Sequence, residues 1–283
     1  MKIAVLSGKG GTGKSCVASA IAIELENCIL VDTDVDCPNQ FLLFKGKEKS
    51  RVIFSASKLA VVGNNNPYGK DYEKICEFGA IKLENNKLRI IETRCEGCGA
   101  CSIAFPELKI VLEPRKSGDI IVTETDRFPL VYGELVPGEA GSGKVVFELK
   151  RFADGIASDN KIPDMLIDVP AGIGCPVIAA VSGCDYAVGV VEPTPASIAN
   201  LERALEVVKH FSIPYLIVMN KTGISEAYEN TIRQKFGKLL IAEIPYDETV
   251  PHMLAVGTPP SLGDNIAAKS LKNMAKALLK KIR

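Results

Sequence analysis

The fold class follows from the segment Lys2-Ile3-Ala4-Val5-Leu6-Ser7-Gly8-Lys9-Gly10-Gly11-Thr12-Gly13-Lys14-Ser15. Its apolar start predicts a short strand, residues 8–15 fit the pattern GxxxxGK(S/T), and the apolar spacing over 17–25 predicts a helix. A glycine loop between a strand and a helix turns its amides toward a bound phosphate, which the helix N-terminus also favours. The motif assigns Lys14 to the β- and γ-phosphates and Ser15 to Mg²⁺, unless the loop is an ordinary glycine turn. The expected nucleotide contacts are Gly8, Lys9, Gly10, Gly11, Thr12, Gly13, Lys14, Ser15 and Cys16.

Lys9 adds a second lysine directly after the first glycine, so that residues 9–15 read KGGTGKS. This loop resembles the deviant Walker A loop of the MinD/ParA/Mrp and nitrogenase-iron-protein group of ATPases. In that family the additional lysine contacts the phosphates of the nucleotide held by the facing subunit. The resemblance therefore implies a homodimer that forms when ATP binds, with Lys9 and Lys14 both acting in catalysis.

Length and composition limit the class of protein. The chain has 283 residues, enough for one large α/β domain or one domain with an insertion. Lys+Arg and Asp+Glu both number 34, so charge gives no reason to expect nucleic-acid binding. The longest apolar runs are too short for a membrane span or a signal peptide, and we therefore expect a cytoplasmic protein.

An acidic turn follows the next predicted strand, Cys28–Val31. Carboxylates at the carboxyl end of a parallel strand lie where open α/β sheets bind ligands. The run Asp32-Thr33-Asp34 resembles switch I of MinD-type ATPases, and the resemblance implies that Asp34 positions the attacking water while Asp32 lies near Mg²⁺. The alternative is a solvated acidic turn.

The strand–helix alternation resumes after residue 150. Met165–Asp168 is an apolar strand ending in aspartate, and Asp168 fits the role of holding Mg²⁺ through water. The segment that follows resembles the family's switch II, in which Gly172 brings a backbone amide to the γ-phosphate. Further strands are predicted at 186–191 and 215–219, with a helix over 195–210 between them.

The nucleotide base is expected to lie near the ends of the last predicted strands. Asn220 and Lys221 match the position from which family members recognise adenine through the asparagine side chain. Pro245 and Asp247 lie on the next strand-to-helix turn and are expected to border the base. Either segment is also compatible with an ordinary turn.

Nine cysteines in a chain with no export signal indicate reduced thiols, some of them metal ligands. Cys95, Cys98 and Cys101 follow the C-x₂-C-x₂-C-x₃-C-P run of bacterial ferredoxins, with Phe105 in place of the fourth cysteine. In two-cluster ferredoxins the fourth ligand comes from the other run, which makes Cys76 the fourth ligand here. The ligand set for a second cluster (positions 66, 69, 72 and 105) contains no cysteine. We therefore expect one [4Fe–4S] cluster, with a Cys₄ zinc site or idle cysteines as alternatives.

Two further segments need an interpretation. Gly138–Lys144 nearly repeats the phosphate-loop pattern, but Val145 cannot bind Mg²⁺, and the alternation over Val145–Leu149 predicts a strand after a hairpin turn. The C-terminal segment Asp264–Arg283 is an amphipathic helix with lysines on one side. A packed core helix is favoured there over a membrane-binding one.

Together these features predict an α/β fold with a doubly wound, mostly parallel sheet of the P-loop NTPase type. The ATPase domain would comprise residues 1–49 and 114–283, and a small α+β ferredoxin-like insert residues 50–113. The expected function is an ATP-hydrolysing switch that uses ATP/ADP, Mg²⁺ and the cluster in electron transfer or redox sensing, with a redox or iron–sulfur protein as its partner. An iron–sulfur carrier, or a positioning ATPase with a vestigial insert, are the alternatives.

Overall fold

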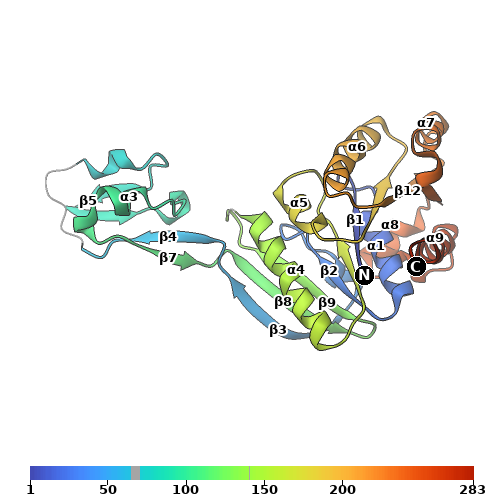
Figure 1. Ribbon diagram of the computed structural model, residues 1–283, viewed down its shortest axis with the longest axis horizontal. Helices are drawn as coiled ribbons and strands as arrows, with labels where there is room; N and C mark the ends of the chain where they lie inside the picture. Colours follow the sequence, from blue (N-terminus) through green and yellow to red (C-terminus); the bar gives the residue numbers. More distant parts are fainter. Residues whose placement is uncertain (65–70, 140) are drawn as a thin grey trace. The chain divides into compact units, whose positions relative to one another are not determined.

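The computed structural model describes residues 1–64, 71–139 and 141–283 and divides into two compact units (Figure 1). The larger unit comprises Met1–Val52, Ile120–Glu134 and Ser142–Arg283, and the smaller unit comprises Ile53–Asp119 and Leu135–Gly141. The smaller unit thus differs from the predicted insert at 50–113, since it extends to Asp119 and includes a second segment. Glu139 of that segment forms an ion pair with Arg115 at 3.0 Å, which ties it to the smaller unit.

The larger unit is built on a nine-stranded sheet with the order β13-β12-β11-β1-β10-β2-β9-β8-β3. From β13 to β9 every neighbouring pair is parallel. β8 joins its neighbour β9 through the short turn at 126–128, which requires an antiparallel pair. The sheet is therefore mostly parallel, as predicted. Its strands are β1 (Lys2–Leu6), β2 (Cys28–Asp32), β3 (Gly46–Phe54), β8 (Gly118–Thr125), β9 (Pro129–Leu135), β10 (Asp164–Asp168), β11 (Tyr186–Val191), β12 (Tyr215–Thr222) and β13 (Leu240–Pro245).

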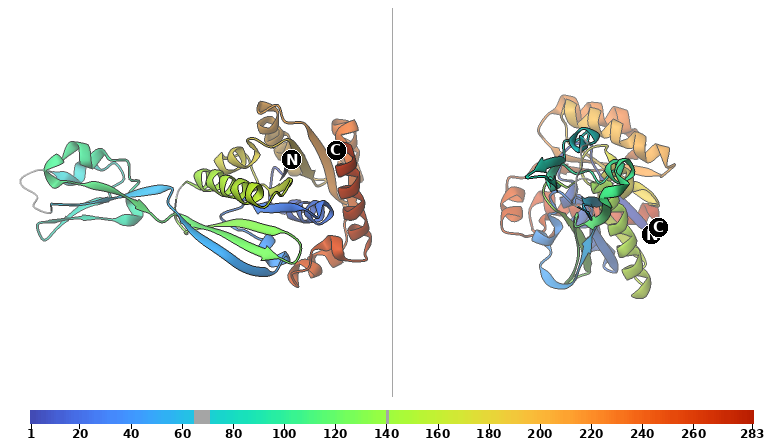
Figure 2. Two further views of the ribbon diagram at one scale, coloured as in Figure 1. Left: turned by 60° about the horizontal axis from the view of Figure 1, so that its bottom comes forward. Right: turned by 90° about the vertical axis from the view of Figure 1, so that its left-hand side faces the viewer.

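Helices cover both faces of this sheet (Figures 1 and 2). α1 and α9 pack on one face, and α4, α5, α6 and α7 on the other, as right-handed crossovers between these strands require. The helices are α1 (Lys14–Leu25), α2 (Gln40–Leu43), α4 (Ser142–Asp159), α5 (Cys175–Val181), α6 (Pro195–His210), α7 (Glu226–Phe236), α8 (Thr249–Ala255) and α9 (Ile266–Ile282), with 3₁₀ turns η4 (Gly237–Leu239) and η5 (Pro260–Leu262).

The C-terminal helix α9 is packed, as the sequence predicted. Leu271, Met274 and Leu278 are among its buried residues and belong to the apolar cluster that joins α1 and α9 to the strands. The Asn265 side chain caps the helix by accepting a hydrogen bond from the Ala268 amide at 2.6 Å. No helix within the described residues combines the length and apolarity needed to cross a bilayer.

The prediction for Val145–Leu149 was wrong, because these residues lie in helix α4 rather than in a strand. Val145, Val146 and Leu149 are buried whereas Phe147 is 60% exposed, so the buried positions follow a helical spacing. Five residues are too few to separate a period of 2 from a period of 3.6 when large apolar side chains occupy both faces. The predicted hairpin turn before these residues was wrong as well, since Ser142–Lys144 form the start of α4.

The smaller unit consists of two short antiparallel pairs with helical turns between them. β4 (Ser57–Val61) pairs with β7 (Val111–Arg115), and β5 (Ile81–Glu84) pairs with β6 (Lys87–Ile90). Asn85 and Asn86, which join the second pair, have φ angles of 50° and 59°, as a tight hairpin turn requires. The helical elements are η1 (Tyr72–Ile75), η2 (Glu92–Arg94), α3 (Ala100–Ala104) and η3 (Pro106–Leu108).

Candidate functional site

The glycine loop lies between β1 and α1, where the sheet changes its direction of winding. In open α/β sheets, ligands bind outside the strand ends at this point. A cavity of about 620 Å³ opens there, lined by the loop residues Lys9–Cys16 together with residues from other elements. Gly13 is required for its conformation, because its φ is +86° and a Cβ atom would lie 2.0 Å from Nδ2 of Asn220. The predicted loop residues from Lys9 to Cys16 thus face a cavity large enough for a nucleotide, whereas Gly8 does not line it and lies against the backbone of Asn200.

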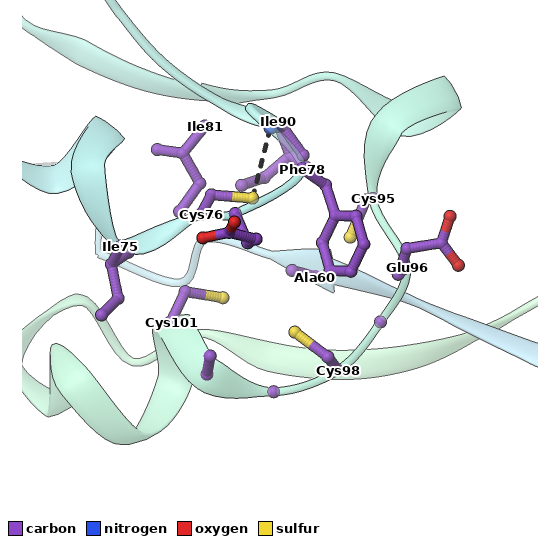
Figure 3. A pocket seen from close by; sticks show the side chains of 15 residues that line it. Ala60, Ile75, Cys76, Phe78, Ile81, Ile90, Cys95, Glu96, Cys98 and Cys101 are labelled. Carbon is purple, nitrogen blue, oxygen red and sulfur yellow. Dashed lines mark hydrogen bonds between the residues drawn. The ribbon is translucent and has the colours of Figure 1, made fainter.

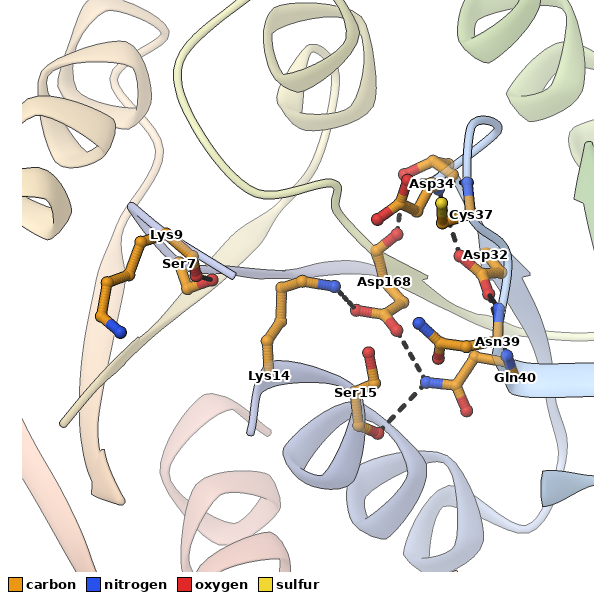
Figure 4. A network of polar contacts seen from close by, with 11 residues as sticks. Ser7, Lys9, Lys14, Ser15, Asp32, Asp34, Cys37, Asn39, Gln40 and Asp168 are labelled. Carbon is orange, nitrogen blue, oxygen red and sulfur yellow. Dashed lines mark hydrogen bonds and ion pairs between the residues drawn. The ribbon is translucent and has the colours of Figure 1, made fainter. Parts of the chain in front are cut away.

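Lys14 forms a buried ion pair with Asp168 (Figure 4). The two come from adjacent strands, since β1 leads into the loop and β10 ends at Asp168. Gln40 completes the arrangement by donating its Nε2 hydrogen bonds to Oδ2 of Asp168 at 2.7 Å and to the Ser15 carbonyl at 3.1 Å. Burying a charge costs free energy unless it is paired and hydrogen-bonded, and each charge here meets that condition.

Asp32 lies beside Asp168 in the register of β2 and β10. Its carboxylate accepts backbone hydrogen bonds from Asp34 at 3.1 Å, Asn39 at 2.8 Å and Gln40 at 3.0 Å, which hold the loop 33–40 in place. Burial and the neighbouring Asp168 raise the pKa of Asp32 to about 7, against the opposing effect of the amides. Both carboxylates are thus engaged by protein donors, Asp168 by Lys14 and Gln40 and Asp32 by three backbone amides.

Asp34 is half-buried and lines the cavity. Burial raises its pKa above the usual range, although Lys14 acts in the opposite direction. The backbone amide of Gly172, expected to reach a γ-phosphate, here donates a hydrogen bond to the Ser7 carbonyl at 3.3 Å. Gly172 has a φ of +105°, a conformation that favours glycine.

Asn220 and Lys221 both contact the glycine loop, although successive residues of a strand normally point to opposite faces. A register irregularity between β12 and β13 at Asn220/Thr222, together with a φ of +59° at Lys221, makes this possible. Asn220 donates to the Thr12 carbonyl at 2.7 Å, and Lys221 donates to the Gly11 carbonyl at 2.5 Å. The sequence placed both residues near the nucleotide but gave no sign of the irregularity.

Pro245 and Asp247 also line the cavity, next to apolar side chains such as Leu254 and Leu271. The Asp247 carboxylate is engaged elsewhere, since Oδ1 accepts hydrogen bonds from the Thr249 amide at 3.0 Å and hydroxyl at 2.6 Å. Asp247 therefore fixes the start of α8, and the surface available to a flat base is mostly apolar.

Two residues near the cavity were missed from the sequence. Gln40 bridges Ser15 and Asp168, and no motif signals an uncharged amide at this position. Glu192 pairs with Lys9 at 2.6 Å and with Lys221 at 2.8 Å. It directly follows strand β11, so the argument applied to Asp32 and Asp168, a carboxylate at the carboxyl end of a parallel strand, also applies to it.

The smaller unit holds a second candidate site, in which Cys76, Cys95, Cys98 and Cys101 line one cavity of about 70 Å³. Figure 3 shows their sulfur atoms pointing toward one another. The Ala80 amide donates a hydrogen bond to Sγ of Cys76 at 3.2 Å. Ala60, Phe78 and Ile81 form part of the wall. The four residues selected by spacing are thus together in space.

Of the alternative ligand positions, 66 and 69 lie outside the described residues. Tyr72 and Phe105 pack edge to face with their ring centroids 4.7 Å apart. Tyr72 is 3% exposed and belongs to the core of the smaller unit, against which Phe105 packs. Aromatic side chains therefore fill the space at these two positions.

Three comparisons relate this chain to known proteins. An uncharacterized protein of Methanocaldococcus jannaschii is 35% identical over 90% of this chain and 88% of its own length. An iron-sulfur cluster carrier protein of Pyrococcus furiosus is 24% identical over 100% of this chain and 86% of its own length. The septum site-determining protein MinD of Pyrococcus horikoshii, solved with Mg-ADP, superposes with a TM-score of 0.60 at 18% identity, covering 99% of this chain and 96% of that one. The model of the CobQ/CobB/MinD/ParA nucleotide binding domain family matches residues 3–260, and the chain belongs to that family.

Proposed function

We propose that this chain is an ATP-hydrolysing dimeric switch that carries one [4Fe–4S] cluster in a ferredoxin-like insert and couples its nucleotide state to electron transfer. The observation that carries the proposal is the presence, in one chain, of a phosphate loop whose Lys14 pairs with the buried Asp168, next to Asp32, and of four cysteines around one cavity. The first supports nucleotide binding and the second supports a resident redox group.

Lys14 and Asp168 neutralise each other and would exchange partners when Mg-ATP binds. The ammonium group of Lys14 would move to the phosphate oxygens, and the Asp168 carboxylate would hold Mg²⁺ through water with the Ser15 hydroxyl as a direct ligand. Gln40 keeps its hydrogen bond to Asp168 and so preserves the carboxylate's orientation. The exchange leaves no buried charge without a partner.

Hydrolysis requires a water molecule aligned with the γ-phosphate. Asp34 borders the cavity, as does Asp247, but the Asp247 carboxylate is engaged at the start of α8. Asp34 would orient the water, whose oxygen forms the new bond to phosphorus as the bond to ADP breaks. Lys14 and the Gly172 amide would stabilise the charge on the transferred group, once that amide leaves the Ser7 carbonyl. Lys9 would act on the nucleotide of the second subunit.

The cysteine site fits an iron–sulfur cluster better than a single zinc ion. Zinc ribbons usually pair two separated C-x₂-C segments, whereas Cys95, Cys98 and Cys101 stand in one C-x₂-C-x₂-C turn. Cys76, Cys95, Cys98 and Cys101 instead surround a cavity, with an amide donating to one sulfur as is usual for cluster ligands. A bound cluster would accept and release single electrons there.

The aromatic pair of Tyr72 and Phe105 supports a count of one cluster. These side chains stand at two of the positions that would supply a second ligand set, and they make an edge-to-face contact. The two side chains pack in the core and occupy space that a second cluster would need. The insert would thus be a one-cluster variant of the two-cluster pattern.

A second candidate is an iron–sulfur carrier, which the name of the Pyrococcus furiosus relative favours. A transferable cluster is expected at exposed cysteines that bridge two chains. Here Cys98 is exposed, but Cys95 is 9% exposed, Cys76 and Cys101 pack against the same core, and all four cysteines belong to one chain. A ligand set within one chain favours a resident group. Transfer of iron to an apo-ferredoxin within minutes would support the carrier function instead.

The direct test is iron, acid-labile sulfide and zinc content of anaerobically prepared protein, together with its ATPase rate. We expect about four iron and four sulfide per chain, lost in Cys76→Ser but retained in the Lys14→Ala variant. ATP turnover should show the reverse pattern. Stoichiometric zinc, or normal ATP hydrolysis by Lys14→Ala, would contradict the proposal.

A further inference from the structure

The side chain of Lys9 lies within its own chain, although the proposed function sends it to a second subunit. Its Nζ atom is 2.6 Å from Oε1 of Glu192. Figure 4 shows Lys14 pointing toward Asp168 and Lys9 pointing away from it. The Lys9 side chain is 31% exposed and that of Glu192 is 9% exposed, so the pair is partly protected from water.

Glu192 is held rigidly by the start of α6. Its backbone amide donates to Oγ of Ser197 at 3.0 Å, and Ser197 is 1% exposed. The Ser197 amide in turn donates to the Thr194 hydroxyl, the N-cap of the helix, at 3.3 Å. The Thr194 hydroxyl also donates to Oε1 of Glu192 at 3.5 Å, and Lys221 lies 2.8 Å from Oε2, so the carboxylate is itself held and cannot easily follow Lys9 outward.

Lys221 occupies the other oxygen of the same carboxylate, at 2.8 Å from Oε2. The left-handed backbone at Lys221, with φ of 59°, directs its ammonium to Glu192 and to the Gly11 carbonyl. Such a conformation is unfavourable for a lysine and persists only where the surroundings hold it. The two hydrogen-bonded lysines also keep the pKa of Glu192 below its usual value, although burial alone would raise it. One ionised carboxylate thus forms ion pairs with both Lys9 and Lys221.

We propose that Glu192 is a positioning residue that retains Lys9 in its own subunit and thereby opposes dimer formation until nucleotide is bound in both subunits. This inference rests on the proposed function, in which Lys9 reaches the nucleotide of a second copy. Lys9 cannot contact Glu192 and that phosphate at the same time. The Lys9–Glu192 ion pair must therefore break when the dimer forms, and the free energy lost with it makes dimerisation less favourable. Lys221 weakens the retention because it shares the carboxylate.

The test measures dimerisation by analytical ultracentrifugation in Mg²⁺ and the non-hydrolysable analogue AMPPNP. Glu192→Gln keeps the shape of the side chain and removes its charge. We expect the dimer dissociation constant to fall roughly five- to tenfold, as a partly exposed ion pair of modest strength predicts. An unchanged or higher dissociation constant overturns the inference.

Lys221→Met is the matched control, because it leaves the Glu192 charge entirely to Lys9. Retention should strengthen, and the dissociation constant should rise, opposite in direction to Glu192→Gln. If both variants shift it in the same direction, they act by loosening the glycine loop and the inference is wrong. A wild-type chain that stays monomeric with AMPPNP overturns the proposed dimer itself. A wild-type dimer that Lys9→Ala abolishes and Glu192→Gln leaves unchanged overturns only the role of Glu192.

Discussion

In the larger unit, the side chains expected to bind nucleotide stand at the carboxyl edge of the sheet, outside the apolar cluster that joins α1 and α9 to the strands. In the smaller unit, Cys95 is a member of the apolar core, and Cys76 and Cys101 pack against it. The core of the larger unit thus does not include the residues of the nucleotide site. In the smaller unit, by contrast, three of the four cysteines belong to the core or pack directly against it.

This difference determines how each unit should respond to damage. A large α/β core buries enough apolar surface to tolerate a changed site residue, whereas a small core depends on a bound group or crosslinks. A group held by four cysteines of the smaller unit would supply folding free energy there, because it binds only the folded arrangement. A changed site residue in the larger unit should therefore abolish function and leave the fold intact. In the smaller unit, the loss of a cysteine ligand should abolish both.

The largest expected effect is the loss of structure in the smaller unit when the proposed cluster is lost. We expect Cys95→Ser to reduce hydrogen-exchange protection of the amides in β5 and β6 by roughly 100-fold or more, while β1 and β10 keep theirs. Cys28→Ser is the matched control, because Cys28 is 1% exposed in the core of the larger unit. It should keep full iron content and the protection of β5 and β6. Unchanged protection in Cys95→Ser would remove the contrast between the two units.

Lys14→Ala tests the larger unit, where we expect function to fail while the fold persists. ATP turnover should fall by about 10²–10³-fold or more, because a group that stabilises transferred charge is lost. The free energy of unfolding should fall by about 3 kcal/mol, because Asp168 is left buried without its partner. Adding Asp168→Asn should restore most of that stability, measured by urea unfolding, but none of the turnover. A double variant that remains unstable would show that the ion pair is not the cause.

The pH dependence of stability should be of intermediate size and should come from Asp32. Its pKa rises from 3.8 to about 7 on folding, mainly through burial. Between these values the folded chain binds a proton that the unfolded chain does not. The contribution of Asp32 to stability is therefore fully present at low pH and is lost as pH rises toward 7, by at most ~1.4 kcal/mol per pH unit. Urea unfolding of nucleotide-free protein at pH 6 and pH 8 measures this, and Asp32→Asn should flatten the difference. Equal slopes in the two proteins would assign the effect to another group.

The smallest effect is expected for Asn220→Ala, which removes one hydrogen bond to the glycine loop. ATP affinity should fall roughly five- to tenfold, in keeping with about 1 kcal/mol for a hydrogen bond, with iron content unchanged. Binding of a fluorescent ATP analogue provides the measurement. A loss above 100-fold would mean that Asn220 holds the whole loop rather than one contact.

Features encoded by local spacing could be predicted from the sequence. The glycine loop, the strand ending at Asp168 and the cysteine spacing each depend on residues close together in the chain or on a fixed motif. In the structure Asp168 forms an ion pair with Lys14, and the four cysteines lie around one cavity. The parallel sheet could be predicted because strands and helices alternate along the chain, and these segments mark where some of them begin or end.

Features that depend on contacts between distant segments could not be predicted. Gln40 contacts Asp168 across 128 positions of the chain, and no residue pattern specifies an amide there. The irregularity at Lys221 is a property of strand pairing, which a single strand sequence does not reveal. The start of helix α4 was mispredicted as a strand for a different reason, because a window of five residues fits both the helical and the strand period.

The central claim, that nucleotide state is coupled to a cluster in the smaller unit, is tested most directly by a reductive titration of the anaerobic protein. The reduction potential of the iron–sulfur signal would be measured with Mg-ADP and with Mg-AMPPNP. Coupling is reciprocal, so a shift of about 60 mV between the two states corresponds to a tenfold difference in relative nucleotide affinity between oxidised and reduced protein. We predict a shift of at least roughly this size, absent in Lys14→Ala. An identical potential in both nucleotide states, or no iron–sulfur signal, would contradict the account.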